Sequence, residues 1–211
     1  MEVYLSDDRY ALLKPLLERR EGRHNKAYRD SKGIDTVGIG SSLRSPDTVN
    51  FMKSNDIPIE DVRSGKRILS DDEVDRLYNH NVAEKERYMP KGELSDNQAS
   101  SLMSQLINAP ELVGPNMRKA IAAGDHTGVL NEMVHRSNRR GSPGVQSRRM
   151  EEAKMYAGEN WDDYANSISD KELKRSFGRL YRIKNKHSRE EALNRFPGLR
   201  KRFESLYKGK K

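Results

Sequence analysis

The sequence predicts an α+β protein, with one small β-hairpin region and a mostly helical remainder. Strand-forming residues gather only between residues 27 and 40, around a glycine-containing turn. Elsewhere, apolar residues recur at the spacing of amphipathic helices, and Ser-x-x-Glu or Ser-x-x-Gln patterns mark helix starts. With 211 residues, the chain is long enough for one good core, or for one domain with a small appendage.

The first predicted helix ends at Glu21. Leucines at positions 12, 13, 16 and 17 supply its apolar face. Pro15 interrupts this set, so we expect the helix to begin near Pro15, with proline in its first turn. Gly22 is the expected stop.

The hairpin follows directly. Tyr28, Ile34, Thr36, Val37 and Ile39 are strand formers, and the segment Ser31-Lys32-Gly33 between them predicts a tight turn.

Helices are predicted for most of the remaining chain. Capping-box patterns predict helix starts at Ser70 (with Glu73) and at Ser95 (with Gln98), the second helix ending by Pro110. Further helices are expected from Pro115 to Gly124, over 127–136, and from Ser142-Pro143 to near Gly158. In the tail, the same capping-box pattern predicts helices from Ser169 (with Glu172) and from Ser188 (with Glu191).

Composition excludes several classes of protein. Hydrophobic and charged residues each make up 34%, and no run approaches the ~18 apolar residues of a spanning helix. The start, MEVYLSDDRY, lacks the pattern of a secretory signal. The absence of cysteine excludes disulfides, zinc-thiolate sites and cysteine nucleophiles. Neither a metal site nor a cofactor is expected, and solvated surface positions are favoured for the scattered histidines, His24, His80, His126, His135 and His187.

The positive charge belongs to the C-terminal quarter. Residues 1–158 hold 25 Lys+Arg and 24 Asp+Glu, whereas residues 159–211 hold 15 and 8. This shift predicts two modules, a main domain at 1–158 and a basic helical module at 159–211. A basic surface of this kind attracts polyanions such as nucleic acid, anionic lipid, teichoic acid or acidic wall material.

Glu21, Asp30 and Thr36 are the candidate catalytic residues. Eight residues separate Glu21 from Asp30, and five separate Asp30 from Thr36. A helix end and a hairpin could bring the three together, so that one carboxyl group donates a proton and the other holds a water. Such pairs are more often solvated surface charges. Asp30 as a turn cap and Thr36 as an ordinary strand residue are the alternatives.

The stretch from Glu21 to Gly40 closely resembles the phage-type lysozymes, glycoside hydrolase family 24. The Glu-x8-Asp-x5-Thr pattern and the segment Thr36-Val37-Gly38-Ile39-Gly40 match that family in place. The likeness covers roughly residues 12–158 and continues at 69–73, 94–98, 123–125 and 143–152. It implies a lysozyme-like α+β fold, with a small hairpin lobe, a mostly helical lobe and a glycan cleft between them.

The resemblance assigns roles by position. Glu21 matches the general acid that protonates the oxygen between N-acetylmuramic acid and N-acetylglucosamine in bacterial peptidoglycan. Asp30 matches the group that orients or activates water, and Thr36 matches the residue that helps hold it. The family is regarded as inverting, which implies carboxyl groups about 6.5–9.5 Å apart.

Three further residues are candidates for substrate binding. Asn108 matches a polar cleft position and is a candidate glycan contact. Arg148 or Arg149 could pair with Glu21 or line the cleft, and surface solvation is the slightly favoured alternative for both.

The chain departs from the family at several points. Ser41 replaces a histidine that mainly supports structure, which puts stability in doubt more than chemistry. Pro110 stands where glycine is common, and the segment 131–137 lacks the usual tryptophan, so the cleft and its subsites are expected to differ. The tail beyond Gly158 exceeds the family's length, and Trp161 is expected to anchor it on the main domain.

Two alternatives to a muramidase remain at this point. A lytic transglycosylase can work with one acid/base glutamate, but the presence of Asp30 and Thr36 favours hydrolysis. A catalytically silent lysozyme-like module of a virion is the alternative from another class. The tail's candidate partners are phage tail or other virion proteins, the anionic envelope and, less favoured, nucleic acid. The enzyme is expected either in the host cytoplasm, awaiting membrane pores, or in the virion.

Overall fold

A computed structural model describes residues 9–30, 33–136 and 143–208. The segment on which the expected lack of a signal rests falls largely outside these residues, and so do Ser31, Lys32 and Ser142. The chain forms two compact units: Met1–Met89 with Met103–Pro110, and Pro90–Leu102 with Glu111–Lys211. The mostly helical structure with one small antiparallel sheet confirms the predicted α+β class.

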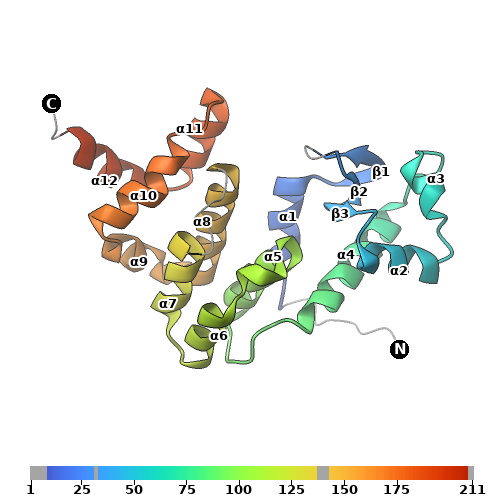
Figure 1. Cartoon of the computed structure of the whole chain (residues 1–211), viewed down its shortest axis with the longest axis horizontal. Coiled ribbons are helices and arrows are strands. Elements are labelled where there is room, and N and C mark those ends of the chain that lie inside the picture. The colour runs from blue at the N-terminus through green and yellow to red at the C-terminus, as the bar shows by residue number, and fades with distance from the viewer. Residues whose placement is uncertain (1–8, 31–32, 137–142, 209–211) are drawn as a thin grey trace. The chain divides into compact units, whose positions relative to one another are not determined.

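The first unit contains all the strands found in the described part of the chain (Figure 1). Its elements are α1 (Leu13–Glu21), β1 (His24–Arg29), β2 (Asp35–Gly38), β3 (Ser41–Ser42), α2 (Pro46–Ser54), α3 (Ile59–Arg63), α4 (Asp71–Glu86) and the last residues of α5 (Asp96–Asn108).

Helix α1 places Glu21 at the edge of the sheet. Leucines 13, 16 and 17 are buried, while Leu12 is exposed and lies just before the helix. The helix begins slightly before the expected Pro15, which still lies in its first turn. Gly22 ends it with φ of 74°, and its N–H donates to the Glu18 carbonyl. This left-handed conformation favours glycine and turns the chain directly into β1.

The sheet has three antiparallel strands in the order β1-β2-β3. Tyr28 pairs with Thr36 across β1 and β2, and Thr36 pairs with Ser42 across β2 and β3. The predicted hairpin is thus present, and a two-residue strand extends it.

Helices α2 and α3 were not predicted. Both are short, and α2 begins at Pro46, which suits the first turn of a helix. α3 packs on β1 and α4 packs on β2, while α2 packs on α4. The predicted capping box opens α4: the Ser70 hydroxyl accepts from the Glu73 N–H at 3.1 Å, and the Glu73 carboxylate accepts from the Ser70 N–H at 2.8 Å.

The second unit is helical throughout its described residues. It contains the first residues of α5, then η1 (Pro110–Leu112, from Glu111 onward), α6 (Pro115–Ala122), α7 (His126–Asn131), η2 (Glu132–Arg136), α8 (Pro143–Ala157), η3 (Gly158–Asn160), α9 (Trp161–Ser167), α10 (Asp170–Leu180), α11 (Lys186–Asn194) and α12 (Pro197–Lys208).

Two predicted helices in this unit differ from the structure, one in its type and one in its start. The helix expected over 127–136 is α-helical only to Asn131 and continues as the π-helix η2. The four consecutive residues 132–135 are all buried there, which the wider turn accommodates between α7, α8 and α10. Ser188 does not open α11. Asn185 does, because its side chain accepts from the Ser188 N–H.

The tail helices share the compact unit of residues 111–157. α10 packs on α8 and on η2, while α12 packs on α9 and α10. Trp161 is 7% exposed and lies against Phe196 and Tyr164, a core position and not an exposed sugar-stacking one. The module boundary at residue 158 stays a prediction. No helix among the described residues is long and apolar enough to cross a bilayer.

Candidate functional site

The three candidate catalytic residues all lie around the hairpin of the first unit. Glu21 is the last residue of α1, Asp30 follows β1, and Thr36 lies in β2. Tyr28 lies near all three residues. It faces Thr36 across the strands, and its pKa is raised first by burial and then by the negative charges of Glu21 and Asp30. The structure therefore places Glu21 against the β2–β3 turn and Asp30 at the β1–β2 turn, and the charges of both act on Tyr28.

The Glu21 side chain lies against Gly40. A Cβ atom on Gly40 would come within 2.9 Å of Glu21 Cγ and 3.3 Å of its carboxyl carbon. Gly40 also has φ of +76°, in the region that other residues rarely adopt. Glycine at this position is thus required both by the backbone and by the space that the glutamate occupies.

Asp30 closes the turn of the hairpin. Its Oδ1 accepts from the Ile34 N–H at 2.8 Å, and its own N–H donates to the Ile34 carbonyl at 2.9 Å. The alternative interpretation of Asp30 as a turn cap is therefore correct as a description of its contacts. Capping uses one lone-pair direction of one oxygen, and a carboxylate has about four such sites. The same contact also fixes the orientation of the carboxyl group.

Thr36 is 4% exposed, and its hydroxyl donates to the Ile34 carbonyl at 3.1 Å. A threonine hydroxyl has one donor hydrogen and two acceptor lone pairs. With its hydrogen directed at Ile34, the oxygen can act toward a water only as an acceptor.

Tyr28 is a site residue that sequence reasoning did not identify. Its hydroxyl donates a long hydrogen bond of 3.5 Å to the Glu21 carbonyl, and its ring lies 4.2 Å from the His24 ring, centroid to centroid. Its place in the predicted hairpin could have identified it, because a residue that pairs with Thr36 must lie beside the candidate catalytic residues.

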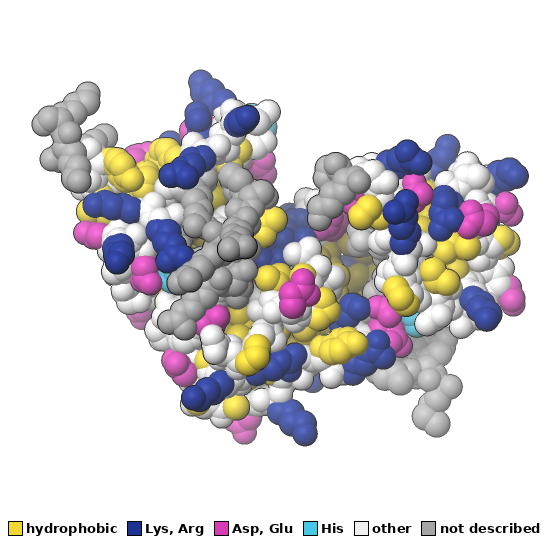
Figure 2. All heavy atoms as spheres, in the orientation of Figure 1, with side chains coloured by type: hydrophobic (Ala, Val, Ile, Leu, Met, Phe, Trp, Pro, Cys, Tyr) yellow, Lys and Arg dark blue, Asp and Glu magenta, His cyan; other side chains and the backbone are white. Residues whose placement is uncertain are grey.

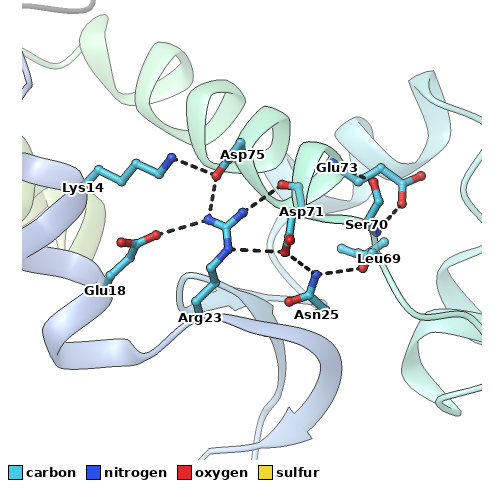
Figure 3. Close-up of polar contacts among 9 residues, drawn as sticks. All are labelled: Lys14, Glu18, Arg23, Asn25, Leu69, Ser70, Asp71, Glu73 and Asp75. Atoms are coloured by element: carbon cyan, nitrogen blue, oxygen red, sulfur yellow. Dashed lines mark hydrogen bonds and ion pairs between the residues drawn. The ribbon is translucent and has the colours of Figure 1, made fainter.

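An ion-pair cluster fixes the start of β1 to α1 and α4 (Figure 3). Arg23 Nη1 lies 2.6 Å from Asp75 Oδ1 and 3.1 Å from Glu18 Oε1, and Nη2 donates to the Asp71 carbonyl. Lys14 adds a second cation on Asp75 at 2.9 Å. The hydrogen bond from Arg23 lowers the pKa of Asp75. This cluster holds the chain two residues beyond Glu21 and so positions the end of α1.

Ser41 replaces the family's histidine with a different structural tie. It is buried at 7%, and its hydroxyl accepts from Asn81 Nδ2 at 2.9 Å. The bond joins β3 to α4, so the sheet keeps a polar link to the long helix in spite of the departure.

Asn108 lies in the first unit, exposed at the C-terminal end of α5. Its exposure leaves it suited to the predicted glycan contact. Pro110 directly follows Ala109 and opens the short 3-10 helix η1. The proline departure therefore changes how the chain leaves α5.

Arg148 and Arg149 lie on α8 of the second unit, where both pair with Glu152. Arg149 and Glu152 are 0% exposed, and the Arg148 side chain is 11% exposed. Surface solvation, the favoured alternative for these arginines, is therefore wrong. A buried carboxylate needs paired cations, and the two arginines supply them. Their role toward substrate stays a prediction.

The expectation of solvated histidines is wrong for His135. It is 6% exposed, its Nδ1 lies 2.8 Å from Ser176 Oγ, and its Nε2 lies 3.9 Å from Glu172 Oε2. It thus joins η2 to the tail helix α10. Within the described ranges, no group of three or more His, Asp or Glu side chains is placed to hold a metal ion.

Comparison with known protein families identifies one match. The model of the family described as phage lysozyme matches residues 18–152, which include Glu21, Asp30, Thr36 and Asn108. Comparison with curated proteins finds no match.

Proposed function

Because the chain belongs to the phage lysozyme family, whose members hydrolyse peptidoglycan, we propose that it is a muramidase. It cleaves the β-1,4 bond between N-acetylmuramic acid and N-acetylglucosamine. The observation that carries this proposal is the position of Tyr28, whose hydroxyl donates to the Glu21 carbonyl and which, two residues before Asp30, pairs with Thr36. Two carboxyl groups around one point are what acid-assisted attack of water on a glycosidic bond requires.

Glu21 is the proton donor in this mechanism. Its side chain lies against Gly40, with no room for another side chain at that position. The contact with the Gly40 backbone restricts the carboxyl group to one orientation, toward the glycosidic oxygen. A catalytic group held in its reactive orientation lowers the activation free energy of hydrolysis.

Asp30 and Thr36 hold the attacking water. The Ile34 N–H fixes Asp30 Oδ1, and the Ile34 carbonyl takes the Thr36 hydrogen. One residue thus orients both groups, Asp30 as the base and Thr36 as an acceptor toward the water. In an inverting reaction the two carboxyl groups stand about 6.5–9.5 Å apart to admit that water.

Comparison of the wild type with Glu21→Gln tests the reaction. Purified peptidoglycan is digested, and the products are analysed by mass spectrometry. We expect reducing muramic acid ends from the wild type and at least ~10²-fold less product from the variant, as loss of a general acid predicts. Glu93→Gln, at an exposed position, is the matched control and should retain full activity.

The other outcomes discriminate between the alternatives. Anhydro-muramic products would identify a lytic transglycosylase. Equal or absent activity in the wild type and Glu21→Gln would identify a silent lysozyme-like module. The same digestion in D₂O, with NMR of the new anomeric centre recorded before mutarotation, would reveal inversion or retention.

The setting of the reaction is the host wall, either at lysis or at genome delivery. In the first setting the enzyme waits in the host cytoplasm for membrane pores, and in the second it travels in the virion. Residues 159–211 would serve as the docking module for virion proteins in the second case. Release of activity from purified particles, compared with lysates that lack particles, separates the two settings.

A further inference from the structure

The positive charge of the tail is concentrated between α10 and the start of α11. Residues 171–189 hold eight Lys+Arg and one acidic residue. Their first part lies on α10, and the rest forms the connection to α11 and its first turn. Dark blue side chains recur in Figure 2 over the region where Figure 1 labels these helices.

The arginines that follow this segment are neutralised within the unit. Arg195 pairs with Glu151 at 3.1 Å and with Glu191 at 2.6 Å. Arg200 pairs with Glu190 and Glu204. Arg202 pairs with Asp170 at 3.0 Å. The arginines that follow the segment are therefore already paired with carboxylates of α8, α10, α11 and α12.

Arg182, Lys184 and Lys186, which we call the basic loop, are exposed. Across the described part of the chain, none of the three forms an ion pair with a carboxylate, in contrast to the arginines that follow. Their alternation along the chain places three cations within five residues.

The basic loop also meets the positive end of a helix dipole. α11 begins at Lys186, and its first turn contains no acidic residue. A cation at a helix N-terminus is unfavourable, because it is repelled by the positive end of the helix dipole. The three cations therefore lower the stability of this helix start, and no carboxylate among the described residues of the unit pairs with them. A bound anion from outside the protein would supply the missing negative charge.

We propose that the basic loop binds a polyol phosphate polymer attached to the bacterial wall. Regularly spaced phosphates match cations on flexible lysine stems, which act as point charges and need no fixed geometry. The polymer is linked to the material that this family hydrolyses, so binding would hold the enzyme on its substrate. The proposal uses the peptidoglycan substrate of the family, but not the muramidase assignment.

The surroundings of the loop favour this polymer over nucleic acid. Single-stranded nucleic acid is usually held by exposed aromatic rings on which bases stack. The nearest aromatic residue, Tyr181, packs against Phe203 at a centroid distance of 4.8 Å, and its hydroxyl donates to Glu204 at 2.7 Å. The Tyr181 ring is therefore engaged within the unit by Phe203 and Glu204.

Binding is measured with the full chain carrying Glu21→Gln, so that the wall is not consumed. The probes are purified walls with their polyol phosphate polymer, the same walls stripped of it by hydrofluoric acid, and single-stranded DNA. The test variant adds Arg182→Gln, Lys184→Gln and Lys186→Gln. The control variant adds Lys53→Gln, Lys91→Gln and Lys119→Gln, which remove the same charge from exposed positions elsewhere.

We expect the test variant to bind intact walls about 10- to 100-fold more weakly, since each of the three basic side chains near an anionic surface contributes roughly two- to five-fold. The control should lose much less, and stripping the walls should abolish the difference. Added salt should weaken the parent more than the test variant. Circular dichroism and thermal unfolding check that both variants fold.

Three results would overturn the proposal. Equal losses in the test and control variants would mean that only net charge matters. Equal binding to intact and stripped walls would exclude the phosphate polymer. Tighter binding to DNA than to intact walls, lost in the test variant, would identify a nucleic-acid surface instead. None of these outcomes bears on hydrolysis, which Glu21→Gln against the wild type tests separately.

Discussion

The side chain of Glu21 occupies the space in which a side chain on Gly40 would stand, 2.9 Å from the position of its Cβ. The two residues come from the end of α1 and the turn between β2 and β3. The Glu21 side chain, the candidate general acid, therefore packs on backbone of the sheet at a position without a side chain. The position of Glu21 therefore depends on a residue 19 positions away that carries no functional group.

Gly40→Ala should impair the enzyme more than it impairs the fold. The added methyl group displaces the Glu21 side chain, and misplacement of a catalytic group by about 1 Å can cost ~10²-fold in rate. We expect kcat/KM on peptidoglycan to fall about 10- to 100-fold, with a stability loss of about 1–2 kcal/mol from the left-handed backbone.

Gly124→Ala is the matched control for this variant. Gly124 has φ of +65° and nothing within 4 Å of the added Cβ, and it lies in the second unit. It should show the same loss in urea unfolding without the loss in kcat/KM. If both variants lose activity equally, the Glu21–Gly40 contact has no special role.

Two substitutions at Asp30 separate its turn-capping and catalytic roles. Asn keeps an Oδ1 that can accept from the Ile34 N–H, whereas Ala removes it. We expect both variants to lose at least ~10²-fold in kcat, because neither carries the carboxylate that activates water. Asp30→Ala should also be less stable than Asp30→Asn, by about 1 kcal/mol.

Steady-state kinetics of the two Asp30 variants tests the catalytic role, and urea unfolding tests the turn-capping role. An Asp30→Asn enzyme with near wild-type kcat would contradict the catalytic role. Equal stability of the two variants would show that the bond to Ile34 contributes little to the turn.

Tyr28→Phe should reduce turnover moderately. The change removes the hydroxyl that lies near Glu21 and Asp30 and donates to the Glu21 carbonyl. We expect kcat to fall about 2- to 10-fold, the range for loss of one ordinary hydrogen bond. Tyr207→Phe, at a 53% exposed position of α12, is the control and should leave kcat unchanged. Unchanged kcat in Tyr28→Phe would remove Tyr28 from the site.

The local parts of this fold were predictable, since their signals lie within a few residues. The capping boxes at Ser70 and Ser95 and the stop at Gly22 have the bonds that their sequence patterns predict. Glu21 lies at the end of α1, Asp30 follows β1 and Thr36 lies in β2, so the elements expected around the three residues are present, while their shared catalytic role stays a prediction.

Long-range polar contacts were not predictable from the same patterns. Arg23 and Asp75 are 52 residues apart, and His135 and Ser176 are 41 apart. A charged residue or a histidine carries no mark of its distant partner in one sequence, so solvation was the reasonable default for His135 and Arg149. Both are buried beside partners on other turns or helices, Ser176 for His135 and Glu152 for Arg149.

The Arg23–Asp75 pair should make stability depend on pH in the acid range. The pKa of Asp75 is lowered in the folded protein, chiefly by its hydrogen bond from Arg23. The contribution of the pair is therefore fully present above the unfolded pKa of about 3.9 and is lost as pH falls through the lower folded value. Asp75 is 40% exposed, so we expect Asp75→Asn to cost about 1 kcal/mol or less at pH 7.

Urea unfolding of the wild type and Asp75→Asn between pH 7 and pH 2 checks this expectation. The difference between the two proteins should shrink as pH falls below about 4, because the wild type then loses the same charge. Asp72→Asn is the control on the same helix: Asp72 is 77% exposed and lies 3.7 Å from Arg76, so its difference should stay within the few tenths of a kcal/mol that an exposed charge in the first turn of a helix contributes. A difference for Asp75→Asn that stays constant to pH 2 would mean that the aspartate acts through its shape and hydrogen bonding, and that its charge does not hold β1 to α4.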